Sequence, residues 1–276
     1  MSEKLQKVLA RAGLGSRREL ERWIEEGRVS VDGRPAALGA RVSPGQDVRV
    51  DGRPVRLEPE GTGPARVLVY HKPDGEVCTR RDPAGRPTVF DRLPPIANGR
   101  WVGIGRLDLN TSGLLLLTND GELANRLMHP SAGIEREYAV RVLGDPPAGV
   151  LQRLRAGVEL DDGPGSFDSI VPGGGGGANR WFHVVIREGR KREVRRLWES
   201  AGLPVSRLIR VRYGPVRLPR NLRKGRWREL EAVQVDALCR LAGLPVHRPP
   251  ARRPARRPPQ RQRTRRGASR NGARSR

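Results

Sequence analysis

Short runs of β-branched and aliphatic residues, separated by amphipathic stretches at irregular intervals, constrain the fold of this chain more than any other feature. Beyond residue 65 these runs predict strands at residues 67–70, 101–104, 114–117, 138–143, 181–186 and 208–213, with 77–79 as a hairpin partner of the first. Helices are predicted at residues 121–128, 147–155, 191–201 and 231–242. Because strands and helices do not alternate regularly, we expect an α+β domain with a mainly antiparallel sheet flanked by helices.

A smaller unit of mixed helices and strands precedes this domain. Apolar residues at i, i+3, i+4 and i+7 from Leu5 predict a helix over residues 3–12. Ser16 and Glu19 have the spacing of a capping box at the start of a second helix, which Gly27 ends. Short strands are expected at residues 29–31, 41–42 and 47–50, with Asp-Gly turns at 32–33 and 51–52. We therefore expect domains at residues 1–60 and 64–245, joined through a loop at 58–64.

The chain carries a net charge of +24, and the charge is unevenly distributed. From Arg248 to Arg276 there are twelve arginines and no acidic residue, which leaves +12 on residues 1–247. The Arg, Pro and Gln content of residues 246–276 cannot build a core, so we expect a disordered basic tail. Such charge favours a polyanion partner, because neutralised phosphates release counterions. A membrane surface is the competing partner, and the absence of an amphipathic helix with bulky apolar anchors argues against it.

Several classes of protein are not expected from the sequence. No apolar run approaches the roughly 20 residues of a membrane span, and the first seven residues lack the apolar stretch of a secretory signal. We therefore expect a cytoplasmic protein. Cys78 and Cys239 lie far apart, and neither they nor the histidines have metal-ligand spacing, so we expect no disulfide and no metal site. The glycine run at 173–177 reads as a flexible loop tip and lacks the Gly-Lys-Ser/Thr of a phosphate loop.

A polar loop between two predicted strands holds a candidate catalytic carboxylate. Residues 105–113 read GRLDLNTSG and follow a strand that ends near Ile104. A loop anchored by buried sheet on both sides can hold Asp108 in a fixed position, as catalysis requires, and Arg106 two residues away favours its ionised form. The alternative is that Asp108 and Asn110 cap turns, as these residue types often do. From the loop alone, turn capping is the favoured interpretation.

Other candidate residues also have two interpretations. Arg17, Arg18 and Arg22 cluster on the second predicted helix, where they either grip a phosphate backbone or form a solvated charged face. Tyr138, taken alone, is better explained as a packed strand aromatic. Arg195, taken alone, is better explained as part of a solvated basic helix face.

The N-terminal unit resembles a known RNA-binding domain. The runs that carry the resemblance are LQKVLARAG from Leu5, GSRR from Gly15 and IEEGRVSVDG from Ile24. They are similar to an S4-type RNA-binding domain over most of residues 3–50. The resemblance implies RNA binding, with Arg17, Arg18 and Arg22 as contacts, and no chemistry.

Five segments of the larger domain resemble one enzyme family in the expected order. They are HKP with Gly75, the loop and strand over residues 105–121, EREYAV from Glu135, EGRKREVRRLW from Glu188 and LIRVRYG from Leu208. Together they resemble the pseudouridine synthases of the ribosomal small-subunit-A and large-subunit-B, E and F group. Arg192 and Glu193 stand where other members read His-Gln, which is more similar to the large-subunit-B branch.

The resemblance implies a role for each matching residue. Asp108 is the essential aspartate that attacks or deprotonates the nucleoside, and Tyr138 lies against the target base and acts as a general base late in the reaction. Arg195 pairs with Asp108 and orients it, and Arg106 enters the space left by the extruded nucleotide. Leu208 or Ile209 supplies the apolar side of the pocket that holds the target base. Further RNA contacts are expected from Lys72, Arg190 and Arg196.

The implied reaction cuts the C1′–N1 bond of uridine, turns the uracil and joins C1′ to C5. No group is exchanged with outside molecules, so we expect no cofactor. The base must leave the stack, which costs a few kcal/mol. The expected substrate is ribosomal RNA, favouring the 23S RNA of the large subunit, and the S4-like unit and tail supply sequence-independent backbone affinity to a monomeric enzyme. A 16S RNA target, or a non-catalytic RNA-binding factor in ribosome assembly, is the alternative.

Overall fold

The computed structural model describes residues 2–57, 65–96, 99–176 and 178–246. The loop expected at residues 58–64 and almost all of the basic tail expected at 246–276 lie outside the described residues, as does the last residue of the glycine run at 173–177. None of the described helices has the length and apolar character needed to cross a membrane.

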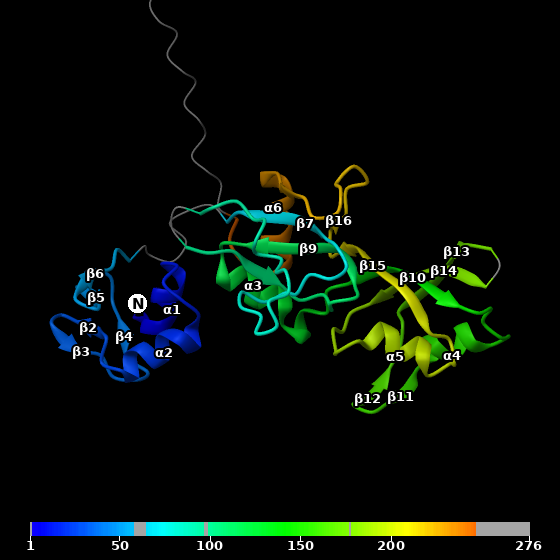
Figure 1. Ribbon diagram of the computed structural model, residues 1–276, viewed down its shortest axis with the longest axis horizontal. Helices are drawn as coiled ribbons and strands as arrows, with labels where there is room; N and C mark the ends of the chain where they lie inside the picture. Colours follow the sequence, from blue (N-terminus) through cyan, green and yellow to red (C-terminus); the bar gives the residue numbers. More distant parts are fainter. Residues whose placement is uncertain (1, 58–64, 97–98, 177, 247–276) are drawn as a thin grey trace, which may run out of the picture.

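The N-terminal unit contains two helices and two small sheets (Figure 1). The helices are α1 (Leu5–Arg11) and α2 (Arg17–Glu25), and the strands are β1 (Glu3–Lys4), β2 (Val29–Val31), β3 (Arg34–Pro35), β4 (Arg41–Val42), β5 (Val48–Val50) and β6 (Arg53–Pro54). The predicted capping box is confirmed, since Ser16 Oγ accepts from Glu19 N at 3.1 Å and the Glu19 carboxylate accepts from Ser16 N at 3.3 Å. The first helix begins later than predicted because Glu3 and Lys4 pair with β4 instead.

A nine-stranded sheet forms the larger domain. Its main path runs β13-β14-β10-β15-β9-β7-β17, with β16 paired to β15 and β8 paired to β9. The bounds are β7 (Val67–Lys72), β8 (Val102–Ile104), β9 (Ser112–Thr118), β10 (Arg136–Leu143), β13 (Ser169–Gly174), β14 (Asn179–Ile186), β15 (Val205–Tyr213), β16 (Val216–Arg217) and β17 (Trp227–Glu229). The described strand pairs are antiparallel except β15–β9, so the expected mainly antiparallel α+β sheet is confirmed.

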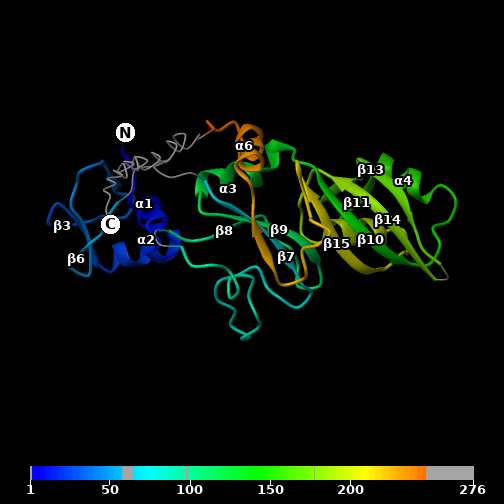
Figure 2. The same cartoon turned by 90° about the horizontal axis from the view of Figure 1, so that it is seen from above.

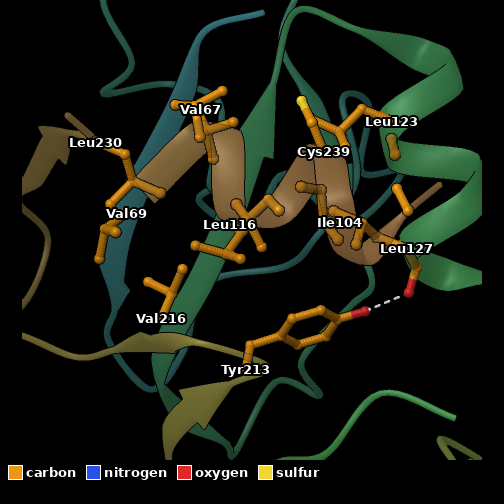
Figure 3. Packing of buried hydrophobic residues seen from close by; sticks show 14 of the residues in the cluster. Val67, Val69, Ile104, Leu116, Leu123, Leu127, Tyr213, Val216, Leu230 and Cys239 are labelled. Atoms are coloured by element: carbon orange, nitrogen blue, oxygen red, sulfur yellow. Dashed lines mark hydrogen bonds between the residues drawn. The ribbon is translucent and has the colours of Figure 1, made fainter. Parts of the chain in front are cut away.

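Helices cover the two halves of this sheet separately. Helices α3 (Gly121–Met128) and α6 (Ala232–Leu241) pack on β7 and β9, and Tyr213 closes that cluster by donating its hydroxyl to Leu127 O at 2.7 Å (Figure 3). Helices α4 (Val150–Ala156) and α5 (Glu193–Glu199) cover β10 and β14, with Trp198 fully buried between them. The remaining elements are the hairpin of β11 (Val158–Leu160) and β12 (Gly163–Gly165) and the short η1 (Pro130–Ala132).

The segment between β7 and β8 differs from the sequence-based prediction. Residues 77–79 form no hairpin strand beside β7, and Val77 makes only an isolated bridge to Thr88. The neighbours of β7 are β9 and β17, because the run of four leucines in β9 offers a longer apolar partner. Trp101 and Leu107 instead cover one face of these strands, where they pack in a cluster with Tyr70 and Leu115.

Candidate active site

The loop from Gly105 to Thr111 joins β8 to β9 and presents Asp108 to solvent between buried neighbours. Leu107 is buried, Asp108 is exposed, and Thr111 is buried again. A turn closes on the loop itself, with Thr111 N donating to Asp108 O at 3.0 Å. Within the described residues, the Asp108 carboxylate makes no side-chain hydrogen bond or ion pair. The backbone is therefore fixed while the carboxylate stays open to a substrate.

Lys72, at the end of β7, holds this loop in place through hydrogen bonds. Its side chain is fully buried, and Nζ donates to Pro73 O at 2.9 Å, Leu109 O at 3.3 Å and Thr111 O at 2.9 Å. Burial lowers the pKa of Lys72, and nearby negative charges, Asp108 among them, oppose that shift. The prediction that Lys72 contacts RNA is wrong for this structure, because its ammonium is enclosed and its donors are used within the loop.

Arg195, on α5, also holds this loop by its backbone. It is buried, and its guanidinium donates to Asn110 O at 2.8 Å and Val205 O at 2.7 Å. The expected ion pair with Asp108 is absent from the described contacts, although burial lowers the pKa of Arg195 and the charge of Asp108 raises it. Arg195 thus reaches the loop two residues beyond Asp108 and fixes its backbone.

Tyr138 lies on the central strand β10 and connects the two halves of the domain. It is half-buried and packs against two clusters, one formed under α4 and α5 and the other containing Leu107. Its ring therefore packs in the cluster that contains Leu107, the residue that precedes Asp108. Tyr138, Arg195 and the loop are brought together although they are far apart in sequence.

The other predicted site residues differ in their exposure to solvent. Arg106 is exposed beside Asp108 and has no ion-pair partner among the described residues. Leu208 is buried in the cluster beneath α5, and Ile209 is half-buried beside Ser112 at the start of β9. Arg17, Arg18 and Arg22 are all exposed on α2, as an RNA-contacting face requires.

Arg190 and Arg196, predicted to contact RNA, are both paired with acidic residues of the same domain. Both donate to Asp162 in the β11–β12 turn, Arg190 at 3.0 Å and Arg196 through two bonds of 2.8 Å. Arg190 also bonds the buried carboxylate of Glu193 at 3.0 Å. These bonds fasten the hairpin to α5, the helix that carries Arg195. The sequence could not indicate this, because Asp162 lies about thirty residues away.

Two further residues, one bonded to the loop and one to the strand that follows it, were missed by the sequence analysis. Arg210 on β15 is buried and donates from Nε to Leu114 O at 2.7 Å, where β15 meets β9. The Cys78 thiol contacts both the N and the O of Leu107 at 3.4 Å. Neither stood out, since Arg210 lies in an ordinary strand pattern and Cys78 has no partner spacing. Among the described residues, no group of three or more His, Cys, Asp or Glu could hold a metal ion.

Lys72→Met is expected to lower the activity of this site more than it lowers the stability of the protein. Methionine keeps the apolar stem but removes the donors to Leu109 O and Thr111 O, and each unsatisfied buried carbonyl costs about 1–3 kcal/mol. Thermal unfolding and single-turnover rates would measure both effects. Lys224→Met is the matched control, because Lys224 is an exposed lysine whose single ion pair among the described residues is with Asp74. An unchanged turnover rate in Lys72→Met would contradict the role of Lys72 in holding the loop.

Comparison with known families gives matches to both domains. Residues 66–200 match the family model described as RNA pseudouridylate synthase, and residues 3–48 match the S4 domain model. A protein of Escherichia coli (strain K12), named ribosomal large subunit pseudouridine synthase B, is 59% identical over 247 residues, which cover 89% of this chain and 85% of that protein. A protein of Pseudomonas aeruginosa with the same name is 57% identical over 251 residues, covering 90% of this chain and 65% of that protein.

A solved structure supports the same fold. A crystal structure of a pseudouridylate synthase superimposes with a TM-score of 0.61 at 24% identity, covering 85% of this chain and 99% of that one. At this identity the likeness concerns the fold alone.

Proposed function

Since the chain belongs to the RNA pseudouridylate synthase family, we propose that it isomerises a uridine of ribosomal RNA to pseudouridine with Asp108 as the catalytic carboxylate. The observation that carries this assignment is an exposed carboxylate on a loop whose backbone is held by two buried cations, Lys72 and Arg195. Such preorganisation is what a positioned catalytic group needs.

The reaction makes separate demands on the neighbouring residues. The C1′–N1 bond breaks, the uracil turns and C1′ joins C5, so N1 gains a proton and C5 loses one. Asp108 acts on the nucleoside while the base is detached. Tyr138 lies against the base and accepts the C5 proton late in the reaction. Arg106, exposed beside Asp108, fills the space that the extruded nucleotide leaves. Leu208 or Ile209 forms the apolar side of the pocket.

The large-subunit RNA is the proposed target. The relatives with 57–59% identity over most of this chain are named for the large ribosomal subunit. The rest of the organisation is proposed accordingly, with an RNA-binding unit at 1–60, a catalytic domain at 64–245 and a basic tail at 246–276 that adds backbone affinity. One chain supplies Asp108, Tyr138 and Arg195, so we propose a monomer, and its ribosomal substrate implies a cytoplasmic location.

The test is to incubate purified protein with unmodified large-subunit and small-subunit ribosomal RNA in separate reactions and to map pseudouridine by mass spectrometry. We expect one modified uridine, or a small cluster, in the large-subunit RNA and none in the small-subunit RNA. Modification of the small-subunit RNA alone would assign the other target. Binding to both RNAs without any pseudouridine would favour the rival function, a non-catalytic assembly factor.

A further inference from the structure

The N-terminal unit and the catalytic domain meet at a close backbone contact. A Cβ atom on Gly13 would lie 2.8 Å from Gly99 O, and one on Gly99 would lie 3.2 Å from Arg11 O. Figure 2 shows α1 and α2 facing the segment that leads into β8. Arg100 follows Gly99 directly, and Arg17 begins α2. A basic residue from each unit is therefore brought to the junction.

A third arginine reaches the same place from the segment after β7. The guanidinium of Arg80 donates to Trp101 O and lies over the Phe90 ring at 4.4 Å from its centre. Trp101 is itself fixed, being buried and donating from Nε1 to Pro94 O at 2.8 Å. Because Arg100 precedes Trp101 in the chain, the same tryptophan determines where Arg80 and Arg100 lie.

These three cations lack acidic partners. Within the described part of the chain, none of Arg17, Arg80 and Arg100 forms an ion pair. Burial lowers the pKa of Arg100 and so does the charge of Arg17, while Glu19, the acid that opposes them, also accepts the capping bond from Ser16 N. Burial and the charge of Arg100 likewise lower the pKa of Arg80.

Other arginines in the same part of the molecule are neutralised. Arg86 pairs with Asp82 at 2.7 Å and Arg66 with Glu229 at 2.6 Å. Arg100 is half-buried while Arg17 and Arg80 are exposed, and bringing like charges together without a counterion is unfavourable. The arrangement is explained if an anion from outside the chain completes it.

We propose that Arg17, Arg80 and Arg100 form a binding site for phosphates of the RNA backbone at the junction of the two units. This proposal rests on the proposed function, because it takes RNA as the partner. Guanidinium groups form bidentate hydrogen bonds to phosphate oxygens. Arg18 and Arg22, exposed on the same helix as Arg17, extend the basic surface along α2, which suits a continuous backbone better than a single anion. Binding there holds the S4 unit against the catalytic domain.

The test measures the salt dependence of binding to an in vitro transcript of large-subunit ribosomal RNA. The logarithm of the binding constant falls linearly with the logarithm of salt concentration, and each lost phosphate contact reduces the magnitude of that slope by about 0.7–0.9. We expect Arg80→Gln/Arg100→Gln to lower it by about 1.4–1.8. The control Arg86→Gln/Arg126→Gln removes the same charge from arginines paired with Asp82 and Glu122, and we expect it to lower the slope by less than about 0.5.

Two single variants keep the proposal testable if the double variant unfolds. Arg100 makes no described hydrogen bond, so Arg100→Gln leaves the fold intact and lowers the slope by about 0.7–0.9. Arg100→Lys keeps the charge and stays near the native slope. Equal slopes for the site variants and the control would overturn the proposal.

Pseudouridine formation at saturating RNA separates this proposal from the proposed function. If the native protein formed no pseudouridine but the slopes differed as expected, the proposed function would fail and the phosphate site would stand. If pseudouridine formed and the slopes matched the control, the phosphate site alone would fail.

Discussion

Asp108→Asn is expected to lower the rate of pseudouridine formation by roughly 10³-fold or more, within the range that a positioned acid–base group supplies. Asparagine has the same shape but neither attacks nor accepts a proton as a carboxylate does. The Asp108 side chain is exposed and makes no hydrogen bond in the described structure, so its loss leaves the fold and the RNA affinity nearly unchanged. Single-turnover kinetics with excess enzyme would measure the rate, and thermal unfolding would measure the stability.

Asp161→Asn serves as the matched control for Asp108→Asn. Asp161 is exposed in the β11–β12 turn and has no described hydrogen bond, so its substitution removes the same charge from the surface without touching the loop. We expect native rates from this variant. Equal product from the two variants would remove Asp108 from its proposed role.

Gly113→Ala is expected to destabilise the protein far more than Asp108→Asn. Gly113 has φ of +107° and pairs with Arg210 where β9 and β15 run parallel. A Cβ atom there would lie 2.3 Å from Arg210 O and 2.6 Å from Arg210 N, so the strands must separate. Such mechanisms produce destabilisation of about 4–5 kcal/mol. Chemical denaturation would measure this loss, and activity should fall with it because the Asp108 loop ends next to this pair.

Alanine substitutions at two other glycines separate the two causes of the Gly113→Ala effect, which are backbone strain at positive φ and the clash of the added methyl group with Arg210. Gly105 has φ of +77°, and no atom lies within 4 Å of the position that an added methyl group would take. Gly105→Ala therefore introduces backbone strain alone, about 1–3 kcal/mol. Gly121, at the start of α3, has open space and no positive φ, so Gly121→Ala should be nearly neutral. A loss in Gly113→Ala no greater than in Gly105→Ala would contradict the close strand approach.

Local signals in the sequence predicted much of the fold correctly. The helix at 121–128 matches α3 because Asp120 caps it, accepting from Glu122 N at 2.8 Å and Leu123 N at 3.1 Å. The capping box of Ser16 and the central strands were equally readable from residue type and period. By contrast, β17 and β13 were missed, since Trp227–Glu229 is exposed and polar and Ser169–Gly174 contains proline and glycine.

The candidate site was predictable in its residues but not in its contacts. Its segments have recognisable motifs, but the partner of each charged side chain depends on the tertiary fold. A lysine is almost never fully buried, so nothing in the sequence indicated that Lys72 would be enclosed. The fold instead encloses it, because the carbonyls of Leu109 and Thr111 converge on its ammonium. Likewise, the sequence predicted Arg190 and Arg196 as part of a solvated basic face, whereas in the structure both donate to Asp162 in the β11–β12 turn.

The most direct test of the account is tritium release from large-subunit ribosomal RNA transcribed with uridine labelled at C5. Joining C1′ to C5 expels the C5 hydrogen, so pseudouridine formation must release label into water. We predict that the native protein alone, with no added small molecule, releases tritium in proportion to the pseudouridine formed, while Asp108→Asn releases none above background. Release at the background level from the native protein, on RNA that it binds, would contradict the account.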